Sequence, residues 1–434
     1  MPTLQIDRLA FGGAGFGRLD GKACFVPYTA PGDRVDISIS KSKSSYLEGM
    51  VTRIESPGEC RVSPLCPVFG ICGGCNWQHV GYETQYRQKE MIFADTMWRM
   101  ARVDKGLISP LLAAEDRYGY RQRIQLKVHS RGGALSLGFF RQGSHYVVDL
   151  PDGCAIARSE LNIALGEVRR IISSSPDAES IPQVDLSVDE GGTVTALFHY
   201  IGCNTEEMHD FLSGLQGGLD HISSIWLQQG RKDTIKSVFG PELMEYTLSF
   251  DGTRELSMSY SADSFSQVNF SQNRRLVDIV RSWATDHVVH DALDLYCGNG
   301  NFSLPLSGHT ASVLGMESYA RSIELACYNA RHNNISNASF ICEDSAAGVT
   351  RLVSEGKVFD LVLLDPPRTG AEAVVRNLGK LRPAYLVYVS CDPPTLGRDL
   401  ATLQKCGFLV DNIQPVDMFP QTYHLESVTF LHAV

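Results

Sequence analysis

The 434-residue chain is too long for one ordinary hydrophobic core, so we expect two to four domains. A hydrophobic content of 43% and a charged content of 20% are typical of globular proteins, and no apolar stretch is long enough to cross a bilayer. The net charge of −10 argues against a protein that coats nucleic acid indiscriminately, but it allows a local basic groove. Residues 1–8 have no signal-peptide or transit-peptide character, so we expect a cytoplasmic monomer without a membrane partner.

Residues 1–57 are predicted to form a small OB-like β-barrel. A glycine-rich stretch at 9–17 is typical of a turn region, and short strands are expected at Ala23–Val26, Arg34–Ile39 and Gly49–Glu55. Barrels of this kind often bind oligonucleotides. A purely structural barrel has the same pattern, so both interpretations stay open.

Residues 58–250 are predicted to form an α+β central domain with four closely spaced cysteines near its start, Cys60, Cys66, Cys72 and Cys75. Without a secretory signal, metal or redox chemistry is favoured over a disulfide framework. The spacing of the last three lacks the two close pairs of a zinc ribbon and is compatible with an iron–sulfur cluster that takes a distant fourth ligand. A zinc site stays open as the alternative.

The central domain also contains a basic strand. Polar and apolar residues alternate along 121–129, so Arg121, Arg123 and Lys127 are expected to share one face. No Asp or Glu occurs from Arg117 to Val148, and several aromatic residues are interleaved with the cations. This pattern predicts a nucleic-acid groove, in which cations meet phosphates and rings stack on bases. An ordinary solvated sheet face is the alternative.

Residues 251–434 alternate between strand and helix, which predicts a doubly wound, mostly parallel α/β sheet. Helices are expected at Tyr319–Asn333 and Thr395–Lys405 here, and near Glu83–Arg102 in the preceding segment. The apolar strand candidates are Ala292–Tyr296, Ser312–Met316, Ser339–Cys342, Asp360–Leu364, Ala384–Val389 and Ser427–His432.

Polar residues follow four of these strands. The turn Asp294–Phe302 contains two glycines that let the backbone approach a ligand, and the next strand is followed by Glu317, which can accept both ribose hydroxyls. Asp344 and Asp365 follow the third and fourth strands. This layout resembles that of S-adenosylmethionine-dependent methyltransferases. A nicotinamide-binding turn is the alternative, although a full G-x-G-x-x-G is not completed, and each acid alone can be an N-cap or turn residue.

Two residues near the end of the chain predict the chemistry. Carbon 5 of a pyrimidine is a poor nucleophile unless a thiolate first adds to carbon 6, and a base must later remove the carbon-5 proton. Cys391, in Ser390-Cys391-Asp392-Pro393, and Glu426 can fill these roles. The alternatives are a buried, inert cysteine and an exposed glutamate. Asp365-Pro366-Pro367-Arg368 alone would suggest an amino-methyltransferase, and Cys297 is expected to be structural.

On these motifs the chain resembles RNA uridine-5 methyltransferases of the TrmA/RumA type over its whole length, with the barrel corresponding to their TRAM domain. One departure is Asp392, where the family often has Asn. The matching motifs are Ser264-Phe265-Ser266-Gln267-Val268-Asn269, the Asp294–Phe302 turn, Asp365-Pro366-Pro367-Arg368, Ser390-Cys391-Asp392-Pro393 and His424-Leu425-Glu426.

The resemblance implies a role for each group of residues. Cys391 would be the nucleophile and Glu426 the base, and Phe265 would stack near a flipped-out uracil. The S-adenosylmethionine pocket would be lined by Gln267, Tyr296, Asn301, Glu317, Asp344 and Asp365. A [4Fe–4S] cluster would be held by Cys66, Cys72, Cys75 and Cys154, with Cys60 as the one competing ligand. RNA would be contacted by Phe265, Asn269, Arg121, Arg123, Lys127 and His424.

The sequence therefore predicts an iron–sulfur methyltransferase that makes 5-methyluridine in 23S ribosomal RNA. The same chemistry on tRNA is one alternative, and a non-catalytic iron–sulfur RNA-binding protein is another. A DNA cytosine-5 methyltransferase is disfavoured, because Asp365-Pro366-Pro367-Arg368 stands where that class usually places its Pro-Cys motif.

Overall fold

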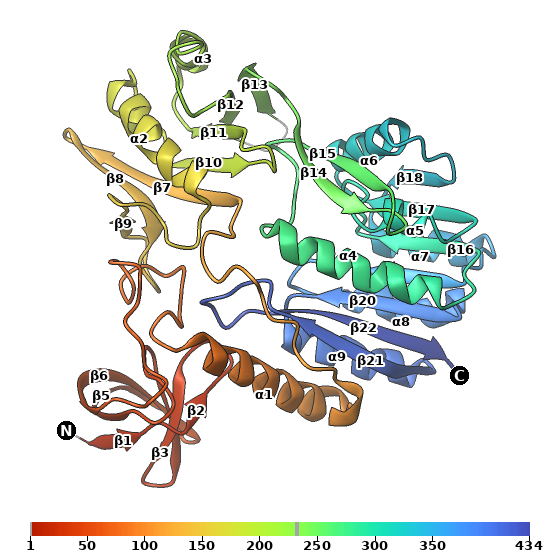
Figure 1. The fold of residues 1–434 in the computed structure, drawn as a ribbon, viewed down its shortest axis with the longest axis horizontal. Helices are drawn as coiled ribbons and strands as arrows, with labels where there is room; N and C mark the ends of the chain where they lie inside the picture. The colour runs from red at the N-terminus through yellow and green to blue at the C-terminus, as the bar shows by residue number, and fades with distance from the viewer. Residues whose placement is uncertain (1, 231–233) are drawn as a thin grey trace.

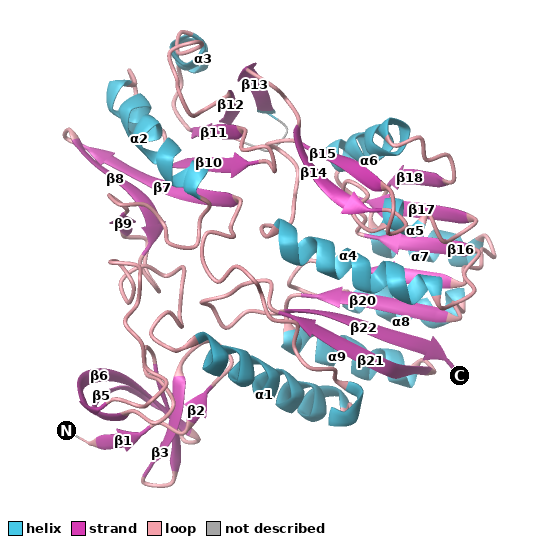
Figure 2. Ribbon diagram, viewed as in Figure 1, coloured by secondary structure: helices cyan, strands magenta, loops and turns pink. Residues whose placement is uncertain are grey.

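Three β-sheets organise the computed structural model, which describes residues 2–230 and 234–434. Figure 1 shows them as separate layers, with the first sheet beside the N-terminus, the second sheet next to helix α2, and the third sheet reaching the C-terminus. The helices gather on the second and third sheets (Figure 2). This mixed α/β architecture agrees with the predicted fold class. None of the described helices is both long and apolar enough to span a bilayer.

The first sheet has six strands in the order β1-β5-β6-β4-β3-β2. Its three predicted strands are confirmed as β4, β5 and β6, and its apolar side chains, including Leu4, Val26 and Ile37, are buried in a small core. Since β1 and β2 stand at opposite edges, the hydrogen-bond ladder of the described residues is barrel-like without being closed. The strands are β1 (Thr3–Gln5), β2 (Arg8–Leu9), β3 (Gly15–Leu19), β4 (Lys22–Val26), β5 (Arg34–Ser42) and β6 (Tyr46–Ser56).

Helix α1 (Tyr82–Ala101) confirms the predicted helix and connects distant parts of the chain. Its buried residues Phe93 and Met97 share one apolar core with Leu396 and Leu400 of helix α9 (Pro393–Lys405). The two helices approach closely: a Cβ added at Gly397 would lie only 2.5 Å from Cβ of Met100. Thus α1, which precedes the central sheet in sequence, is packed against the C-terminal sheet.

The central sheet has seven strands in the order β13-β12-β11-β10-β7-β8-β9. Helix α2 (Ser159–Ser174) covers one face, where Ile124 and Leu126 of β7 are buried as the alternating pattern predicts. The elements are β7 (Arg123–Arg131), β8 (Ala134–Phe140), β9 (Val147–Asp149), β10 (Gln183–Val188), β11 (Val194–Tyr200), β12 (Ser224–Gln229), β13 (Ile235–Phe239) and α3 (Thr205–Ser213), with short 3₁₀ turns at Lys105–Leu107 and Ala178–Ser180.

An antiparallel pair, β14 (Met244–Ser249) and β15 (Glu255–Tyr260), connects the central sheet to the C-terminal sheet. Its buried side chains pack with Leu276 and Val280 of helix α4 (Phe270–Thr285), in the core that also reaches the last sheet. The pair spans the boundary predicted at residue 250. The division into segments 1–57, 58–250 and 251–434 stays a prediction.

The C-terminal sheet has the order β18-β17-β16-β19-β20-β22-β21. Its first five strands are parallel, β22 is antiparallel to β20, and β21 is antiparallel to β22. All six predicted strands are confirmed, and β21 was not predicted. The strands are β16 (Asp291–Leu295), β17 (Ser312–Glu317), β18 (Ala338–Cys342), β19 (Leu361–Leu364), β20 (Tyr385–Ser390), β21 (Phe408–Val416) and β22 (Glu426–Ala433). The remaining helices are α5 (Ser303–Leu306), α6 (Ala320–His332), α7 (Ser345–Ser354) and α8 (Glu372–Leu381).

The close contact between α1 and α9 predicts that a glycine-to-alanine substitution destabilises the protein at Gly397 in α9 but stabilises it at Gly166 in α2. Gly397→Ala should lower the free energy of unfolding by about 1–3 kcal/mol, because its Cβ would collide with Met100. Gly166→Ala, in α2, meets no atom within 4 Å and should raise it by about 0.5–1 kcal/mol. Urea unfolding of both variants tests this, and equal shifts would contradict the packing described.

Candidate active site

The antiparallel pairing of β20 and β22 brings Cys391 and Glu426 together. Ser390, the last residue of β20, is the register partner of Ser427, the second residue of β22. Cys391 follows Ser390 and Glu426 precedes Ser427, so the thiol and the carboxyl lie on neighbouring strands at the same edge of the sheet. The two groups lie within electrostatic reach, since the charge of Glu426 is one of the causes of the raised pKa of Cys391.

Cys391 lies in an environment that favours the neutral thiol. Burial raises its pKa to about 12, with a further increase from the negative charge of Glu426. Arg368 opposes this increase through its charge and a hydrogen bond to the thiol. A thiolate at this position is therefore favoured only when the negative charge nearby is reduced or a ligand supplies compensation.

The side chains of Glu426 and His424 are both shielded from solvent, which shifts their pKa values. Glu426 is 3% exposed, and burial raises its pKa well above the usual range, with repulsion from Asp365 adding to the effect and Arg368 opposing it. A glutamate with a raised pKa is a stronger base once it is ionised. Burial lowers the pKa of His424 to about 4, so near neutral pH this residue is an uncharged hydrogen-bonding group beside the ring of Tyr423.

Sequence reasoning assigned no role to Arg368, although it belongs to a motif that was singled out. This exposed residue influences the pKa values of Cys391, Glu426 and His424. Its position just after β19 could have been noticed, since β19 and β20 are adjacent parallel strands whose carboxyl ends meet. Arg368 is thus a cation at the centre of the candidate site.

Asp392 forms the N-cap of α9. Its side chain accepts a hydrogen bond from the backbone N–H of Thr395 at 3.0 Å, and Pro393 follows at the first helical position. Asn and Asp are equally good N-caps, so the departure from Asn at this position preserves the turn that presents Cys391.

Fully buried Asp294 and half-buried Asp365 lie near the candidate site. Burial raises the pKa of Asp294, at 0% exposure on β16, to about 7, and burial also raises that of Asp365 to about 7, with repulsion from Asp294 adding to it. The Ser303 hydroxyl donates to Oδ2 of Asp294, whereas Oδ1 is buried without a hydrogen-bond partner among the residues described.

The turn after β16 has the geometry of a ligand-binding turn. Tyr296 has a φ of +65°, and Gly298 and Gly300 have φ values of +54° and +88°. A positive φ in a non-glycine residue costs of order 1–3 kcal/mol and persists where the surroundings impose it, often at ligand sites. The ring of Tyr296 is half-buried, and burial raises its pKa to about 12.

Glu317 and Asp344 each use one carboxylate oxygen within the protein. Oε1 of Glu317 accepts from the backbone N–H of Tyr319 at 2.9 Å. Oδ1 of Asp344 accepts from the N–H groups of Ala346 and Ala347, both at 3.0 Å, and so caps helix α7. The cap expected as the alternative for Asp344 is therefore present, while its second oxygen is still available to a ligand at the same strand edge.

Asn301 and Gln267 are held by protein contacts. The amide of Asn301 exchanges hydrogen bonds with that of Asn273 at 2.9 and 3.0 Å and accepts from the Tyr246 hydroxyl at 3.0 Å. The backbone carbonyl of Gln267 accepts from the side chain of Gln122. These contacts connect the turn after β16 to α4, and Gln122, which directly precedes β7, to the segment that follows β15.

Phe265 and Asn269, from the same predicted motif, have opposite environments. Phe265 is 65% exposed, an unusual position for a large apolar ring and one suited to stacking. Asn269 is 1% exposed, caps α4 through the N–H of Gln272, and donates to the carbonyl of Met418 at 3.2 Å. The predicted RNA contact of Asn269 needs correction, because its amide is buried and occupied within the protein.

The predicted basic face is partly neutralised. Strand β10 places Asp185 beside β7, where it accepts from Arg123 at 3.4 Å and from Gln125 at 3.1 Å. Arg123 also donates to the carbonyls of Ser264 at 2.8 Å and Ala262 at 3.2 Å. Its guanidinium therefore holds the segment that precedes Phe265, and the acid-free run was misleading because the acid comes from a neighbouring strand.

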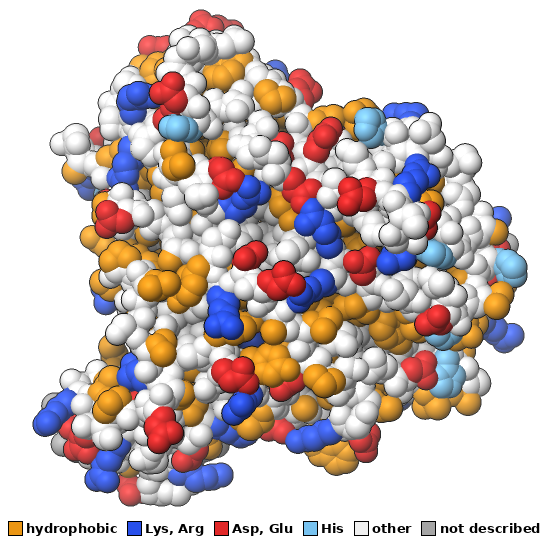
Figure 3. Space-filling model, in the orientation of Figure 1, with side chains coloured by type: hydrophobic (Ala, Val, Ile, Leu, Met, Phe, Trp, Pro, Cys, Tyr) orange, Lys and Arg blue, Asp and Glu red, His pale blue; other side chains and the backbone are white. Residues whose placement is uncertain are grey.

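Two other predicted cations of this face have protein partners. Arg121 donates to the carbonyl of Arg123 at 2.9 Å, and Lys127 bonds to Gln183 and lies 5.4 Å from the ring centroid of Phe140. Lys127, Phe140, Gln183 and His199 line a pocket of about 240 Å³. Figure 3 shows Lys and Arg side chains interspersed with acidic ones across the visible face, without one single-sign patch.

The cysteine segment brings together the four predicted ligands without closing a metal site. Burial raises the pKa of Cys72 to about 11 and that of Cys75 to about 12, and in each case neighbouring Cys154 and Cys66 add to the increase. Mutual influence of this kind requires that the thiols lie close in space. In residues 2–230 and 234–434, no group of three or more His, Cys, Asp or Glu is placed to hold a metal ion. Four clustered sulfur donors suit an iron–sulfur cluster chemically, while their arrangement here is not a coordination shell.

Comparison with known families gives two matches. Residues 81–434 match the family described as tRNA (Uracil-5-)-methyltransferase, and residues 3–52 match the TRAM domain. Together these matches include the first sheet, helix α1, the central sheet and the whole C-terminal sheet.

Curated relatives match the chain over almost its full length. The chain is 34% identical over 445 residues to 23S rRNA (uracil(1939)-C(5))-methyltransferase RlmD of Azoarcus sp., covering 99% of each chain. It is 33% identical over 450 residues to an uncharacterized RNA methyltransferase of Thermosynechococcus vestitus, covering 99% of this chain and 97% of the relative.

One solved structure shares the fold throughout. The Pyrococcus abyssi tRNA (uracil-54, C5)-methyltransferase, in complex with S-adenosyl-L-homocysteine, superposes with a TM-score of 0.76 at 24% identity, covering 99% of this chain and 100% of the other. This similarity shows the fold.

The buried carboxyl of Asp294 predicts a pH-dependent stability. Its pKa is raised to about 7, so between about pH 4 and 7 the native state keeps a proton that the unfolded state loses, and stability falls as pH rises through this window. In the wild type, the free energy of unfolding should fall between pH 4 and 7.5. In Asp294→Asn this fall should be smaller by about 2–4 kcal/mol. Urea unfolding at both pH values measures it.

Asp291→Asn is the matched control, since Asp291 lies on the same strand and is exposed. It should leave the pH dependence as in the wild type. A wild-type pH dependence in the Asp294→Asn variant as well would contradict the raised pKa.

Proposed function

Because the chain belongs to the tRNA (uracil-5-)-methyltransferase family, we propose that it methylates carbon 5 of a uridine in 23S ribosomal RNA, with S-adenosylmethionine as the methyl donor. The observation that carries this proposal is the β20–β22 register, which puts a thiol and a buried carboxyl side by side at the edge of the sheet. The full-length similarity to an enzyme of this name supports the ribosomal substrate.

The proposed reaction uses Cys391 first and Glu426 last. The Cys391 thiol first loses its proton to water, and the thiolate then forms a bond to carbon 6 of uracil, which turns the carbon 5–carbon 6 double bond into an enolate. Carbon 5 then takes the methyl group from the sulfonium, and S-adenosylhomocysteine leaves. Glu426 then removes the proton from carbon 5, the carbon 5–carbon 6 double bond forms again, and the sulfur–carbon bond breaks. The raised pKa of Glu426 suits this step, because a buried carboxylate holds the abstracted proton well.

Arg368 is proposed to help the first step. Its positive charge lowers the pKa of Cys391 against the effects of burial and of Glu426, and it is exposed, so it is accessible to a uracil or phosphate oxygen. Phe265 is proposed to stack on the extruded region of the RNA, as exposed aromatic side chains do in base-flipping enzymes.

The cofactor site is proposed to lie over the strand ends of β16, β17 and β19. The positive-φ turn at Tyr296–Gly300 brings backbone N–H groups close to a ligand. Glu317 is proposed to accept the ribose hydroxyls, and Asp344 and Asp365 to face the adenine and methionine ends. Gln267 and Asn301 complete the proposed pocket.

RNA is proposed to approach from the side of Phe265 and the central sheet. Arg121, Lys127 and His424 line this approach, whereas Arg123 supports the Phe265 segment from within. We propose that residues 1–57, as a TRAM domain, add further RNA contacts. The protein is proposed to act in the cytoplasm as a monomer.

A [4Fe–4S] cluster is proposed at Cys66, Cys72, Cys75 and Cys154. The four thiols are clustered, and the backbone N–H of Gly74 donates to Sγ of Cys72 at 3.4 Å, a contact that stabilises a thiolate ligand. The segment would have to contract around the cluster on binding, because the thiols are not yet placed as ligands.

The proposed substrate predicts where label appears. With labelled S-adenosylmethionine and unmodified transcripts, we expect 5-methyluridine in 23S rRNA and none in tRNA, mapped by mass spectrometry of nucleosides. Label in tRNA alone would keep the chemistry and replace the substrate. No label in either, from cluster-containing protein, would favour a non-catalytic RNA-binding protein.

Cys391→Ala is the control for the chemistry. The wild type should form a covalent adduct with 5-fluorouridine RNA, because fluorine cannot be removed as a proton, and the variant should form none. An adduct in the variant would exclude Cys391 as the nucleophile.

The proposed cluster predicts iron content. Anaerobically purified protein should hold about four irons per chain, and Cys154→Ala should lose most of them. Cys203→Ala is the matched control, since Cys203 is an exposed cysteine outside the segment and should keep the wild-type content. Full iron content in the Cys154→Ala variant would exclude Cys154 and point to Cys60 as the fourth ligand.

A further inference from the structure

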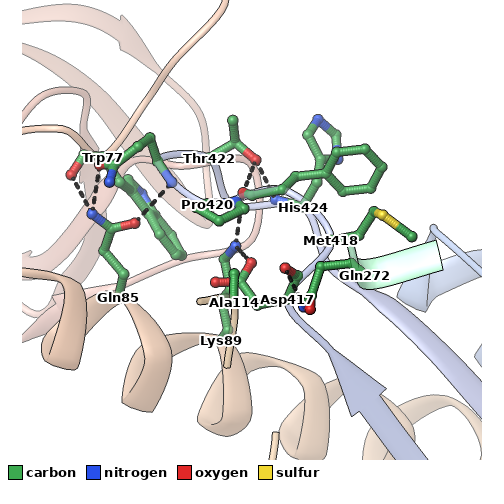
Figure 4. A network of polar contacts seen from close by, with 12 residues as sticks. Trp77, Gln85, Lys89, Ala114, Gln272, Asp417, Met418, Pro420, Thr422 and His424 are labelled. Carbon is green, nitrogen blue, oxygen red and sulfur yellow. Dashed lines mark hydrogen bonds and ion pairs between the residues drawn. The ribbon is translucent and has the colours of Figure 1, made fainter. Parts of the chain in front are cut away.

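The segment between β21 and β22 leads directly to the proposed base and contains no regular secondary structure. Residues 417–425 connect the two strands, include His424, and end directly before Glu426. Figure 4 shows Gln85 and Lys89 reaching from α1 toward this segment. Side chains from a distant helix therefore hold the segment that leads to the proposed base.

Gln421 is the most heavily bonded residue of this segment. Its side-chain Oε1 accepts from Nε2 of Gln85 at 2.9 Å, and its backbone N–H donates to Oε1 of Gln85 at 3.1 Å. Its Nε2 donates to the carbonyl of Arg117 at 3.3 Å, and its own carbonyl accepts from the N–H groups of Asn76 and Trp77 at 3.1 and 3.0 Å. All four polar groups of Gln421 are thus paired with three other segments.

The backbone of Gln421 is strained. Its φ is +69°, a left-handed conformation that side chains other than those of Asn and Asp seldom adopt, and it is 2% exposed. A conformation of this kind costs of order 1–3 kcal/mol and is retained only where surrounding contacts impose it. The bonds to Gln85 provide such contacts, since Gln85 is itself 1% exposed and donates to the carbonyls of Trp77 and Val80.

The two flanks of the segment are fixed independently. At its start, Asp417 forms a fully buried ion pair with Lys89 at 2.6 Å and accepts from the Tyr82 hydroxyl at 2.8 Å. The carbonyl of Pro420 accepts from the Tyr120 hydroxyl at 3.0 Å. At its end, Glu426 is fixed by the β22 pairing. Gln421 lies between these anchors and sets the course of the chain toward His424.

We infer that Gln421, held by Gln85, is a positioning residue for proton removal by Glu426. The inference rests on the proposed function. Both side chains are buried and their amides are bonded within the protein. The pair acts by holding the approach to β22 so that the Glu426 carboxyl meets the carbon-5 proton. Loss of the pair should therefore slow the last step, in which the carbon 5–hydrogen and sulfur–carbon 6 bonds break, more than the earlier formation of the sulfur–carbon 6 bond.

The same contacts tie the base to the cysteine segment. Asn76 and Trp77, whose N–H groups bond the Gln421 carbonyl, directly follow Cys75. Any rearrangement at Cys75 that moves these two amides therefore reaches Gln421 through hydrogen bonds, with no intervening flexible residues.

Gln85→Leu tests the inference, with Gln88→Leu as its matched control. Gln88 lies on the same helix and also accepts from a backbone N–H, that of Leu9, but it does not contact residues 417–425 in the bonds described. With natural uridine RNA and S-adenosylmethionine, Gln85→Leu should lower kcat on the order of 10²-fold with KM nearly unchanged, because a displacement of about 1 Å can cost this much. A methylated covalent RNA adduct should accumulate on denaturing gels, and Gln88→Leu should behave as the wild type.

Gln421→Gly is the second variant. Glycine tolerates a φ of +69°, so the backbone course is kept while the side-chain bonds to Gln85 and Arg117 are lost. It should also accumulate the methylated adduct, while trapping with 5-fluorouridine RNA proceeds as in the wild type.

Two outcomes separate the inference from the function on which it rests. If the wild type forms no adduct with 5-fluorouridine RNA, the proposed function fails. If the wild type is active but Gln85→Leu and Gln421→Gly lose adduct formation and turnover equally, or match Gln88→Leu, the positioning role is wrong.

Discussion

The proposed chemistry depends on one antiparallel strand, β22, in an otherwise parallel sheet. Parallel strands deliver only their carboxyl ends to the ligand-binding edge, whereas β22 delivers its first residue to the same edge. The proposed nucleophile can therefore come from the end of β20 and the proposed base from the start of β22. Loss of solvent raises the pKa of half-buried Cys391 and of buried Glu426, so both groups favour their protonated forms at rest, whereas the proposed reaction uses their charged forms.

The loop between β21 and β22 needs external support, since it has no ladder of its own. That support is polar and buried: the Lys89–Asp417 ion pair, the paired amides of Gln85 and Gln421, and the cap at Asn269. Removing one partner of a buried ion pair leaves an uncompensated charge and typically costs about 3–5 kcal/mol. Satisfied networks of this kind specify one arrangement, which suits a segment that presents a base.

Local patterns predicted most of the helices and strands, because strand ends and turns are encoded over short stretches. They failed where the outcome depends on register between distant strands. Asp185 neutralises Arg123 only because β10 pairs with β7, and Arg368 reaches Cys391 only because β19 lies beside β20. Asn269 was predicted to contact RNA, because the sequence does not reveal that the 417–425 loop buries it. Strand β21 was not predicted, because polar and charged residues interrupt its apolar pattern.

The contacts of helix α1 with the 417–425 loop affect how the two segments can change during evolution. The helix precedes the central sheet in sequence but carries Lys89 and Gln85, the partners of Asp417 and Gln421 more than three hundred positions later. An exchange of N-terminal halves between diverged relatives would mix partners that were selected together, and the recombinant would carry a mismatched buried charge or amide. Residues 82–101 and 417–425 should therefore diverge in step, and a functional chimera must take both from the same parent.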